Sequence, residues 1–280
     1  MSRAAVVTGV STGIGRAVAV RLAAAGWRVF GSVRSADDAR AFAAAVPGAT
    51  ALTFDVTDDP AIARAAEEVA AATGGAGLGA LVNNAGIAVA GPLQHLSLDR
   101  FREQLAVNVT GALAVTQAFL PLLEGGDGRA PGRIVNVSSV AGRMAMPFIG
   151  AYAASKFALE GLSDSLRREL MIHGIAVIVV APASIATPIW DKSVGEGADE
   201  YSRTAYRDAL DRMLAIADAT GRAGLPAERV AEVVLRALTV RRARHRYAVN
   251  DAPVSSFLMR RIPPRLLDRL IARSVGLRRR

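Results

Sequence analysis

The chain has 280 residues, of which 51% are hydrophobic and 21% are charged. This composition excludes an intrinsically disordered chain, and the length is sufficient for one large domain with a sizeable core. The chain has no cysteine, which excludes disulfides, thiolate metal sites and cysteine nucleophiles. Its three histidines lie too far apart in the sequence for a local zinc motif, so no metal site is expected.

The formal net charge of +9 is concentrated near the C-terminus. Residues 241–280 contain twelve arginines and two aspartates, a net charge of +10, whereas residues 1–240 carry a net charge of −1. No base-reading motif accompanies this charge, so nucleic-acid binding is not expected. The N-terminus has no secretory signal pattern, and the uncharged stretch 105–123 contains polar residues, so a cytoplasmic protein is expected.

Short apolar runs alternate with alanine-rich stretches, a pattern typical of a parallel sheet with helices on both faces. In chain order, strands are predicted over 4–8, 28–33, 50–54, 79–83, 133–138, 175–180 and 246–249. Helices are predicted over 13–25, 36–46, 58–73, 97–124, 151–173 and 226–240. The stretch 183–225 breaks this rhythm and is interpreted as an irregular lid or binding segment.

The first predicted strand is followed by Thr8-Gly9-Val10-Ser11-Thr12-Gly13-Ile14-Gly15, which opens the first predicted helix. Glycines at these positions let the backbone turn tightly and approach a pyrophosphate, whose charge the amino terminus of the helix stabilises. By itself the motif is weak, because a bare tight turn needs glycine as well.

Further motifs follow in chain order. Asp55 follows the third predicted strand, and Asn83-Asn84-Ala85-Gly86 ends the fourth. Ser139 follows the fifth strand, and Tyr152-Ala-Ala-Ser-Lys156 begins the next helix. A lysine four residues after a tyrosine lies on the same helix face, where its charge stabilises a phenolate and eases proton exchange. With only two lysines and four tyrosines in the chain, this spacing arises by chance with a probability of roughly 3%.

In this order and spacing, the motifs resemble the short-chain dehydrogenase/reductase family over about residues 4–190 and, more loosely, over 226–250. The general sequence pattern resembles the hydroxysteroid- and retinol-type branch of this family. The resemblance implies one doubly wound α/β domain with a mostly or wholly parallel seven-stranded sheet in the order 3-2-1-4-5-6-7. It implies a catalytic domain over 1–250 with a substrate-loop insertion at about 188–225, followed by a basic extension over 251–280. Relatives are commonly dimers or tetramers paired through the helices at 97–124 and 151–173.

The resemblance also assigns roles to individual residues. Tyr152 is the acid/base beside Lys156, and Ser139 hydrogen-bonds the substrate oxygen. Asn108 holds a helix distortion and a water that links the lysine to solvent, although a purely structural Asn108 stays open. Asp55 bonds the adenine amino group, with an ordinary helix cap as the alternative. The implied cofactor-binding set is Gly9, Ser11, Thr12, Gly13, Ile14, Gly15, Arg34, Ser35, Asp55, Val56, Asn83, Ala85, Gly86, Tyr152, Lys156, Pro182, Ile185 and Thr187.

The end of the second strand bears on the choice of nucleotide. A ribose with free hydroxyls is bound by a carboxylate here, and that carboxylate would repel a 2′-phosphate. This chain instead has an apolar Val33 followed by Arg34, whose planar guanidinium suits a phosphate. NADP(H) is therefore favoured over NAD(H). Against this stand a neutral Thr12, where many NADP-using relatives have a second basic residue, and the possibility that Arg34 is a solvated loop charge.

The segment after the sixth strand departs from the family pattern, because Ala183 stands where relatives have a glycine. An alanine would be strained if that position needed a positive φ. Beyond it, substrate contacts are expected from apolar side chains that suit a lipophilic secondary alcohol or ketone, such as a steroid, retinoid or polyketide. The alternative is plain core packing. The substrate-binding set is Ser139, Met144, Phe148, Tyr152, Ile189 and Trp190.

The basic extension is predicted to form a short helix from about residue 263. Leu266, Leu267, Leu270 and Ile271 are expected to share one face, with arginines on the other. Such a helix packs on its own domain, caps the pocket, or contacts a membrane or an acidic partner. Two rival functions stay open: a sensor or scaffold that binds NADP without turnover, and an adaptor that acts through the arginine-rich tail.

Overall fold

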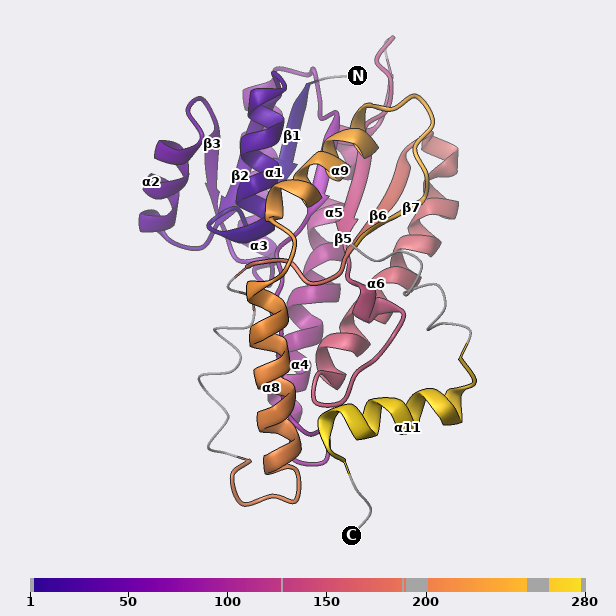
Figure 1. Cartoon of the computed structure of the whole chain (residues 1–280). Coiled ribbons are helices and arrows are strands. Elements are labelled where there is room, and N and C mark those ends of the chain that lie inside the picture. The colour runs from indigo at the N-terminus through magenta and orange to yellow at the C-terminus, as the bar shows by residue number, and fades with distance from the viewer. Residues whose placement is uncertain (1–2, 127, 188, 190–200, 251–261, 278–280) are drawn as a thin grey trace.

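A computed structural model describes residues 3–126, 128–187, 189, 201–250 and 262–277. Its seven strands form one sheet in the order β3-β2-β1-β4-β5-β6-β7, and every neighbouring pair is parallel (Figure 1). The predicted order is thereby confirmed, with a wholly parallel sheet. The strands are β1 (Ala4–Val7), β2 (Arg28–Val33), β3 (Thr50–Thr53), β4 (Ala80–Asn83), β5 (Arg133–Val137), β6 (Ala176–Pro182) and β7 (Arg246–Val249).

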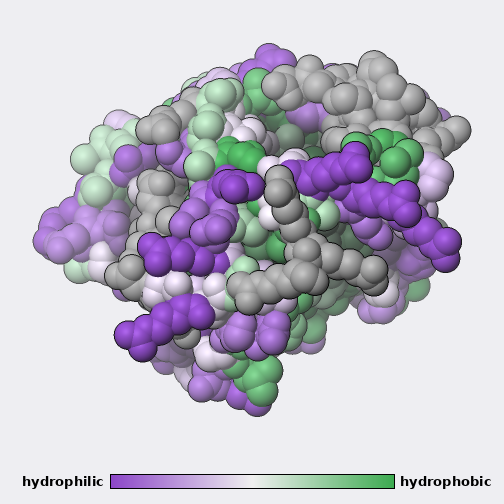
Figure 2. All heavy atoms as spheres, turned by 60° about the horizontal axis from the view of Figure 1, so that its bottom comes forward, coloured by the Kyte–Doolittle hydropathy of each residue, from purple (hydrophilic) through white to green (hydrophobic). Residues whose placement is uncertain are grey.

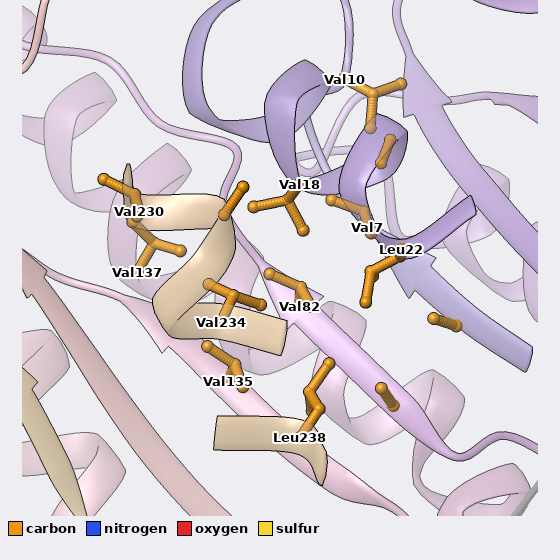
Figure 3. Packing of buried hydrophobic residues seen from close by; sticks show 14 of the residues in the cluster. Val7, Val10, Val18, Leu22, Val82, Val135, Val137, Val230, Val234 and Leu238 are labelled. Carbon is orange, nitrogen blue, oxygen red and sulfur yellow. The ribbon is translucent and has the colours of Figure 1, made fainter. Parts of the chain in front are cut away.

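Helices cover both faces of the sheet, because the strands are apolar on both sides. The helices of the Rossmann-type layers are α1 (Gly13–Ala24), α2 (Ala36–Ala45), α3 (Asp59–Thr73), α4 (Leu98–Leu105), α5 (Gly111–Leu123), α6 (Gly150–Glu169) and α9 (Ala227–Thr239). One core cluster joins α1, α2 and α9 to the sheet, and a second joins α3 and α5 to the opposite face. Figure 3 shows the first cluster, in which Val18 and Leu22 of α1 and Val234 of α9 pack over Val82 and Val135.

The helix predicted over 97–124 is interrupted by a π-helical turn. α4 ends at Leu105, the π turn η1 spans Ala106–Thr110, and α5 follows from Gly111. By length and composition alone, Leu98–Leu123 is apolar enough to cross a membrane, a test that the core helix of a soluble protein also passes. Val115, Phe119 and Leu123 of this helix are buried in the second core cluster.

The prediction of an irregular stretch over 183–225 is wrong for its second half. Residues Arg207–Arg222 form helix α8, which lies at the carboxyl end of the sheet (Figure 1). Its inner side carries Leu210, Met213 and Ala217 at helical spacing, and they pack in a small cluster with Tyr201. Residues 188 and 190–200 lie outside the described part of the chain.

The predicted tail helix is present as α11 (Pro264–Val275), which begins at a proline in its first turn. Its apolar residues do not share one buried face as expected. Leu266 and Leu270 are 49% and 46% exposed, whereas Val275 is buried against α8. The face of α11 that packs on the domain is therefore shifted by about one residue from the predicted face. The shift follows from the packing of Val275 against α8.

Candidate active site

The glycine loop between β1 and α1 has a shape that only glycine allows. Gly9 and Gly13 have φ values of +69° and +58°. A Cβ on Gly15 would lie 2.2 Å from the Gly9 carbonyl oxygen. Thr12 is the N-cap of α1 without a side-chain capping bond, and the first turn of the helix contains no acidic residue. The amino terminus of α1 is therefore suited to hold a pyrophosphate, with Ser11 and Ile14 in the same loop.

Three polar side chains, those of Thr8, Asn84 and Ser32, fix this loop. Thr8 Oγ1 accepts bonds from the backbone N–H groups of Asn84 and Ala85, each at 2.9 Å. The Asn84 amide in turn donates to the carbonyl oxygens of Thr8 at 2.9 Å and Gly9 at 3.1 Å. Ser32 accepts a 3.0 Å bond from the Gly9 N–H. The ends of three strands are thus joined around the glycine loop.

The side chain of Asn83, a residue of the predicted cofactor-binding set, points into the core rather than toward the crevice. Its Nδ2 donates to Thr116 and to Asn136, both at 2.9 Å, and Asn136 donates to Ser163 at 2.8 Å. Asn83 is therefore part of a buried polar network that joins β4, β5, α5 and α6. Only its backbone, with Ala85 and Gly86, remains available to a cofactor.

The end of β2 brings an exposed arginine close to an aspartate. Arg34 Nη1 lies 4.0 Å from Asp55 Oδ2. The other carboxylate oxygen of Asp55 accepts bonds from the Thr57 N–H at 2.9 Å and the Thr57 hydroxyl at 2.7 Å. The N-cap of α3 is Asp58 rather than Asp55, so the helix-cap alternative does not apply to Asp55. Ser35 is occupied as the N-cap of α2, where its hydroxyl accepts from the Asp38 N–H at 3.1 Å. Val56 is buried in the second core cluster.

Ser139, Tyr152 and Lys156 meet where β5 ends and α6 begins, and all three are buried. The Lys156 ammonium donates to the Val137 carbonyl at 2.9 Å and lies 5.7 Å from the centre of the Tyr152 ring. The Ser139 side chain hydrogen-bonds Tyr152 and accepts a 3.1 Å bond from the Ala141 N–H. A phenol, a hydroxyl and an ammonium group are therefore assembled at one strand end.

Burial shifts the ionisation of both groups in the pair. Desolvation raises the pKa of Tyr152, and the hydrogen bond from Ser139 opposes part of that rise. Desolvation lowers the pKa of Lys156 to about 8, and the negative charge of Glu160 opposes it. Glu160 lies one helical turn beyond Lys156 and is bound by Arg143 and Arg246, each at 3.1 Å. The sequence analysis missed Glu160, although its i+4 spacing from Lys156 was visible.

Asn108 lies in the π turn, which agrees with the expected helix distortion. Its side chain brackets Ile87, accepting from the N–H at 2.9 Å and donating to the carbonyl at 3.0 Å. It also donates to Ser155 at 3.0 Å. Gln104, which the sequence analysis missed, is fully buried one turn earlier and bonds Val89 and Ile87. These two amides join the loop after β4 to helix α6, which carries Ser155, Tyr152 and Lys156.

The segment after β6 reaches the glycine loop. Thr187 lies against Gly13, because a Cβ on that glycine would come within 3.3 Å of Thr187 Cγ2. Ile185 forms a bridge with Leu225, and its side chain is buried in the first core cluster, so its backbone is the part left to a cofactor. Pro182 ends β6. Ala183 does not have a positive φ, so the backbone of this alanine is not strained as it would be in that conformation.

The expected substrate side chains divide into two groups. Ile189 packs with Ile149 against Tyr152, and Met144 is half-buried nearby in sequence. Phe148 instead packs into the cluster formed by α8 and α11. Trp190 lies outside the described residues. Among the residues that the structure describes, no group of three His, Cys, Asp or Glu side chains is arranged to hold a metal ion.

Proteins with such a sheet bind dinucleotides in the crevice at the carboxyl ends of the strands, where the strand order reverses. Comparison with known proteins identifies one family within this broad class of dinucleotide-binding proteins. The family model for short chain dehydrogenases matches residues 3–196. The chain belongs to the short-chain dehydrogenase/reductase family and is an oxidoreductase, as the sequence motifs predicted.

Several relatives extend the comparison. The NADPH-dependent 3-dehydrocapnine reductase of Ornithobacterium rhinotracheale is 40% identical over 271 residues, which cover 96% of this chain and 95% of the relative. Retinol dehydrogenase 5 of Homo sapiens is 41% identical over 187 residues, 65% of this chain and 57% of that protein. The crystal structure of a short-chain dehydrogenase/reductase from Burkholderia phymatum in complex with NAD has a TM-score of 0.79 at 25% identity and covers 95% of each chain.

Proposed function

We propose that this oxidoreductase interconverts a lipophilic secondary alcohol and the corresponding ketone, with NADP(H) as cofactor and Tyr152 as the acid/base. The observation that carries the proposal is the buried contact of Tyr152 with Ser139, beside the Lys156 ammonium. A buried phenol with a hydroxyl and a cation beside it has the parts that general acid–base catalysis requires.

A nicotinamide dinucleotide fits the residues at the strand ends. The glycine loop with the amino terminus of α1 would hold the pyrophosphate, Asp55 the adenine, and Thr187 the nicotinamide end. When bound, the cofactor supplies or accepts the hydride. Ala85 and Gly86 follow β4 and would form the wall beside the adenosine.

The protein residues manage the proton and the developing charge. In the direction of reduction, the Tyr152 hydroxyl donates its proton to the carbonyl oxygen, and the phenolate left behind is stabilised by the Lys156 ammonium. Ser139 donates a hydrogen bond to the same oxygen and stabilises its negative charge. In the direction of oxidation, the phenolate accepts the proton of the alcohol. Asn108 keeps the π turn and α6 in register around this pair.

Three observations support NADP(H) over NAD(H). Val33 is apolar where a ribose-binding carboxylate would stand, and Arg34 is exposed at the adenosine end of the crevice. The Ornithobacterium relative is described as NADPH-dependent. The Burkholderia phymatum structure, by contrast, contains NAD. We therefore expect the residues at the end of β2 to decide which of the two nucleotides this chain prefers.

The lipophilic substrate class is supported by the side chains around Tyr152. Ile149 and Ile189 pack against the phenol with Ala88 and Ala141, so the reacting carbon would sit in apolar surroundings. We also propose a homo-oligomer paired through α5 and α6, the helices that relatives use, and a cytoplasmic location. A catalytic domain over 1–250 with a separate extension over 251–280 stays a prediction.

Replacement of Tyr152 by Phe tests the proposed function. We expect kcat for reduction of a lipophilic ketone to fall by about 10²–10⁴, because the proton donor is lost. The affinity for NADPH, measured by quenching of protein fluorescence, should stay nearly unchanged. Tyr247→Phe is the matched control, since Tyr247 lies on β7 and its hydroxyl accepts a 3.1 Å bond from the Arg244 N–H.

Two outcomes would contradict the proposal. Retained turnover in Tyr152→Phe would remove Tyr152 from the chemistry. Binding of NADPH by the wild-type protein without turnover of any ketone or alcohol in a broad lipophilic panel would favour the rival sensor or scaffold function.

A further inference from the structure

A cavity of about 390 Å³ lies at the carboxyl end of the sheet, between α11 and the segment 145–150. Met146 and Phe148 form one wall, Ile271 and Leu277 form the opposite wall, and Leu93 lies between them. Asp268 is the one charged residue that lines the described cavity, and it is exposed. The volume lies within the range of about 300–1,000 Å³ typical of small-molecule sites.

The cavity is lined by a segment that leads into helix α6, which carries Tyr152. Gly150 lines the cavity and begins α6, and Tyr152 follows two residues later. Ile149 packs both against Tyr152 and against the cluster that contains Phe148. The segment that lines the cavity therefore continues within two residues to the Tyr152 phenol, and Ile149 joins the two regions by packing.

Phe148 indicates that this wall is built to a defined shape. It is the one described non-glycine residue with a positive φ, +66°, a conformation that costs about 1–3 kcal/mol and persists only where neighbours impose it. Its carbonyl accepts a 2.7 Å bond from the Gly91 N–H. The centres of the Phe148 and Tyr206 rings lie 6.0 Å apart in an edge-to-face arrangement, and the Tyr206 hydroxyl donates to Gln94 at 2.9 Å.

α11 is fixed over the cavity by its last turn. Val275 is buried in one cluster with Phe148, Tyr201 and Met213. The Arg212 guanidinium of α8 lies against Gly276, where a cation stabilises the carboxyl end of α11. The helix turns Ile271 toward the cavity and leaves Leu270 half exposed on its outer side. Figure 2 shows the face that carries α11, with long hydrophilic side chains beside hydrophobic patches.

We propose that this cavity is the subsite for the apolar chain of the substrate, and that α11 limits the length of chain that the enzyme accepts. The ligand class is an amphiphile with its carbonyl or hydroxyl group near one end and an uncharged hydrocarbon chain beyond it. The exposed carboxylate of Asp268 disfavours a chain that ends in a carboxylate. This inference rests on the proposed function, because it takes Tyr152 as the reacting end.

A series of straight-chain methyl ketones of increasing length tests the inference with NADPH as reductant. In the wild-type enzyme, kcat/KM should rise by about fourfold per added methylene until the cavity is full, and then level off. Ile271→Trp fills the cavity and should lower kcat/KM for the long ketones by about tenfold or more, with the short ketones unchanged. Leu270→Trp adds the same indole on the outer side of α11 and should keep the wild-type length profile.

Binding of the fluorescent apolar probe N-phenyl-1-naphthylamine gives a readout independent of turnover. The probe should bind the wild-type protein and Leu270→Trp, and bind Ile271→Trp at least about tenfold more weakly. Circular dichroism and NADPH binding show whether each variant is folded. If Ile271→Trp is folded but keeps the wild-type length profile and probe affinity, the subsite is wrong while the proposed function stands. If no ketone is reduced by the wild type, the proposed function fails, and probe binding alone decides whether the cavity takes an apolar ligand.

Discussion

Lys156 is a buried ammonium group whose ionisation can be observed directly. The chain has only two lysines, so protein labelled with [¹³Cε]lysine gives two side-chain signals, and Lys192→Arg leaves one. We expect the Lys156 signal to titrate at about pH 8 in the nucleotide-free protein, because burial disfavours the charged form. Titration near the ordinary lysine pKa would contradict the desolvated position of this group.

The same shift affects stability. Because the folded protein releases the Lys156 proton at a lower pH than the unfolded chain, the unfolded chain binds more protons between about pH 8 and 10.5. The contribution of Lys156 to the free energy of unfolding should therefore rise with pH across this window. Urea unfolding of wild type and Lys156→Met at several pH values measures the difference.

The proposed preference for a 2′-phosphate can be tested at Arg34. Removal of its exposed guanidinium in Arg34→Ala should raise KM for NADPH by about tenfold or more and change KM for NADH much less, because only the first nucleotide carries the extra phosphate. Steady-state kinetics with both nucleotides checks this. An equal change in both KM values would reject the assignment of Arg34 to the phosphate.

At the residue scale, the motif positions could be predicted because their chemistry fixes their spacing. Tyr152 and Lys156 had to lie one helical turn apart, and in the structure Lys156 lies beside the Tyr152 ring while Tyr152 hydrogen-bonds Ser139. The direction of a side chain could not be predicted in the same way. Asn83 belongs to a motif, yet its amide turns into the core toward Thr116 and Asn136, because residues in a strand alternate between the two faces.

The glycine loop is an element whose geometry leaves no room for a methyl group at one position. In Gly15→Ala, the added Cβ would collide with the Gly9 carbonyl and the Asn84 amide. We expect affinity for NADPH to fall by about 100-fold and the protein to lose about 1–3 kcal/mol of stability. Calorimetric titration and urea unfolding measure the two effects.

Gly161→Ala is the matched control for this loop. Gly161 lies inside α6, and a Cβ there would meet no atom within 4 Å. Alanine has the higher helix propensity, so this variant should be about 0.5–1 kcal/mol more stable and bind NADPH normally. A loss of affinity in both variants would point to a general effect rather than to the loop.

At the element scale, periodicity predicted the sheet and most helices but missed two local features. No sequence pattern marks the π turn at Ala106–Thr110. The turn follows from the hydrogen bonds that Asn108 and Gln104 make outside the helix. Helix α8 does carry apolar residues at helical spacing, but the polar stretch before it led the whole of 183–225 to be interpreted as irregular.

At the scale of the whole molecule, the proposed oligomer predicts a contact across α6. Phe157 is 46% exposed on this helix, although a large aromatic side chain is most often covered. Phe157→Glu should convert a dimer or tetramer to smaller species in light scattering after gel filtration. Val20→Glu changes a residue of equal exposure, 45%, on α1 of the opposite layer and should leave the assembly intact. A monomeric wild type would remove the proposed pairing.

The arrangement of the sheet and its flanking helices could be predicted from the sequence. The arrangement of α8 and α11 could not. The strand order follows from the family motifs and from right-handed crossovers. The seating of α11 depends instead on which of its neighbouring apolar residues finds a complementary surface. Val275 contacts Phe148, more than a hundred residues earlier in the chain, and α8, about sixty residues earlier. No local sequence pattern contains these contacts.

The π turn in the helix beside the catalytic site makes the protein sensitive to chain length at that point. A π turn holds one residue more than the regular helix around it. Deletion of one residue within Ala106–Thr110 would remove this extra residue and let an unbroken α-helix form, in which α4 and α5 keep nearly their present faces. Asn108 would be displaced instead, because it bonds Ile87 and Ser155 from within the turn. A deletion in these five residues should therefore remove the bonds of Asn108 and leave the packing of α4 and α5 largely intact.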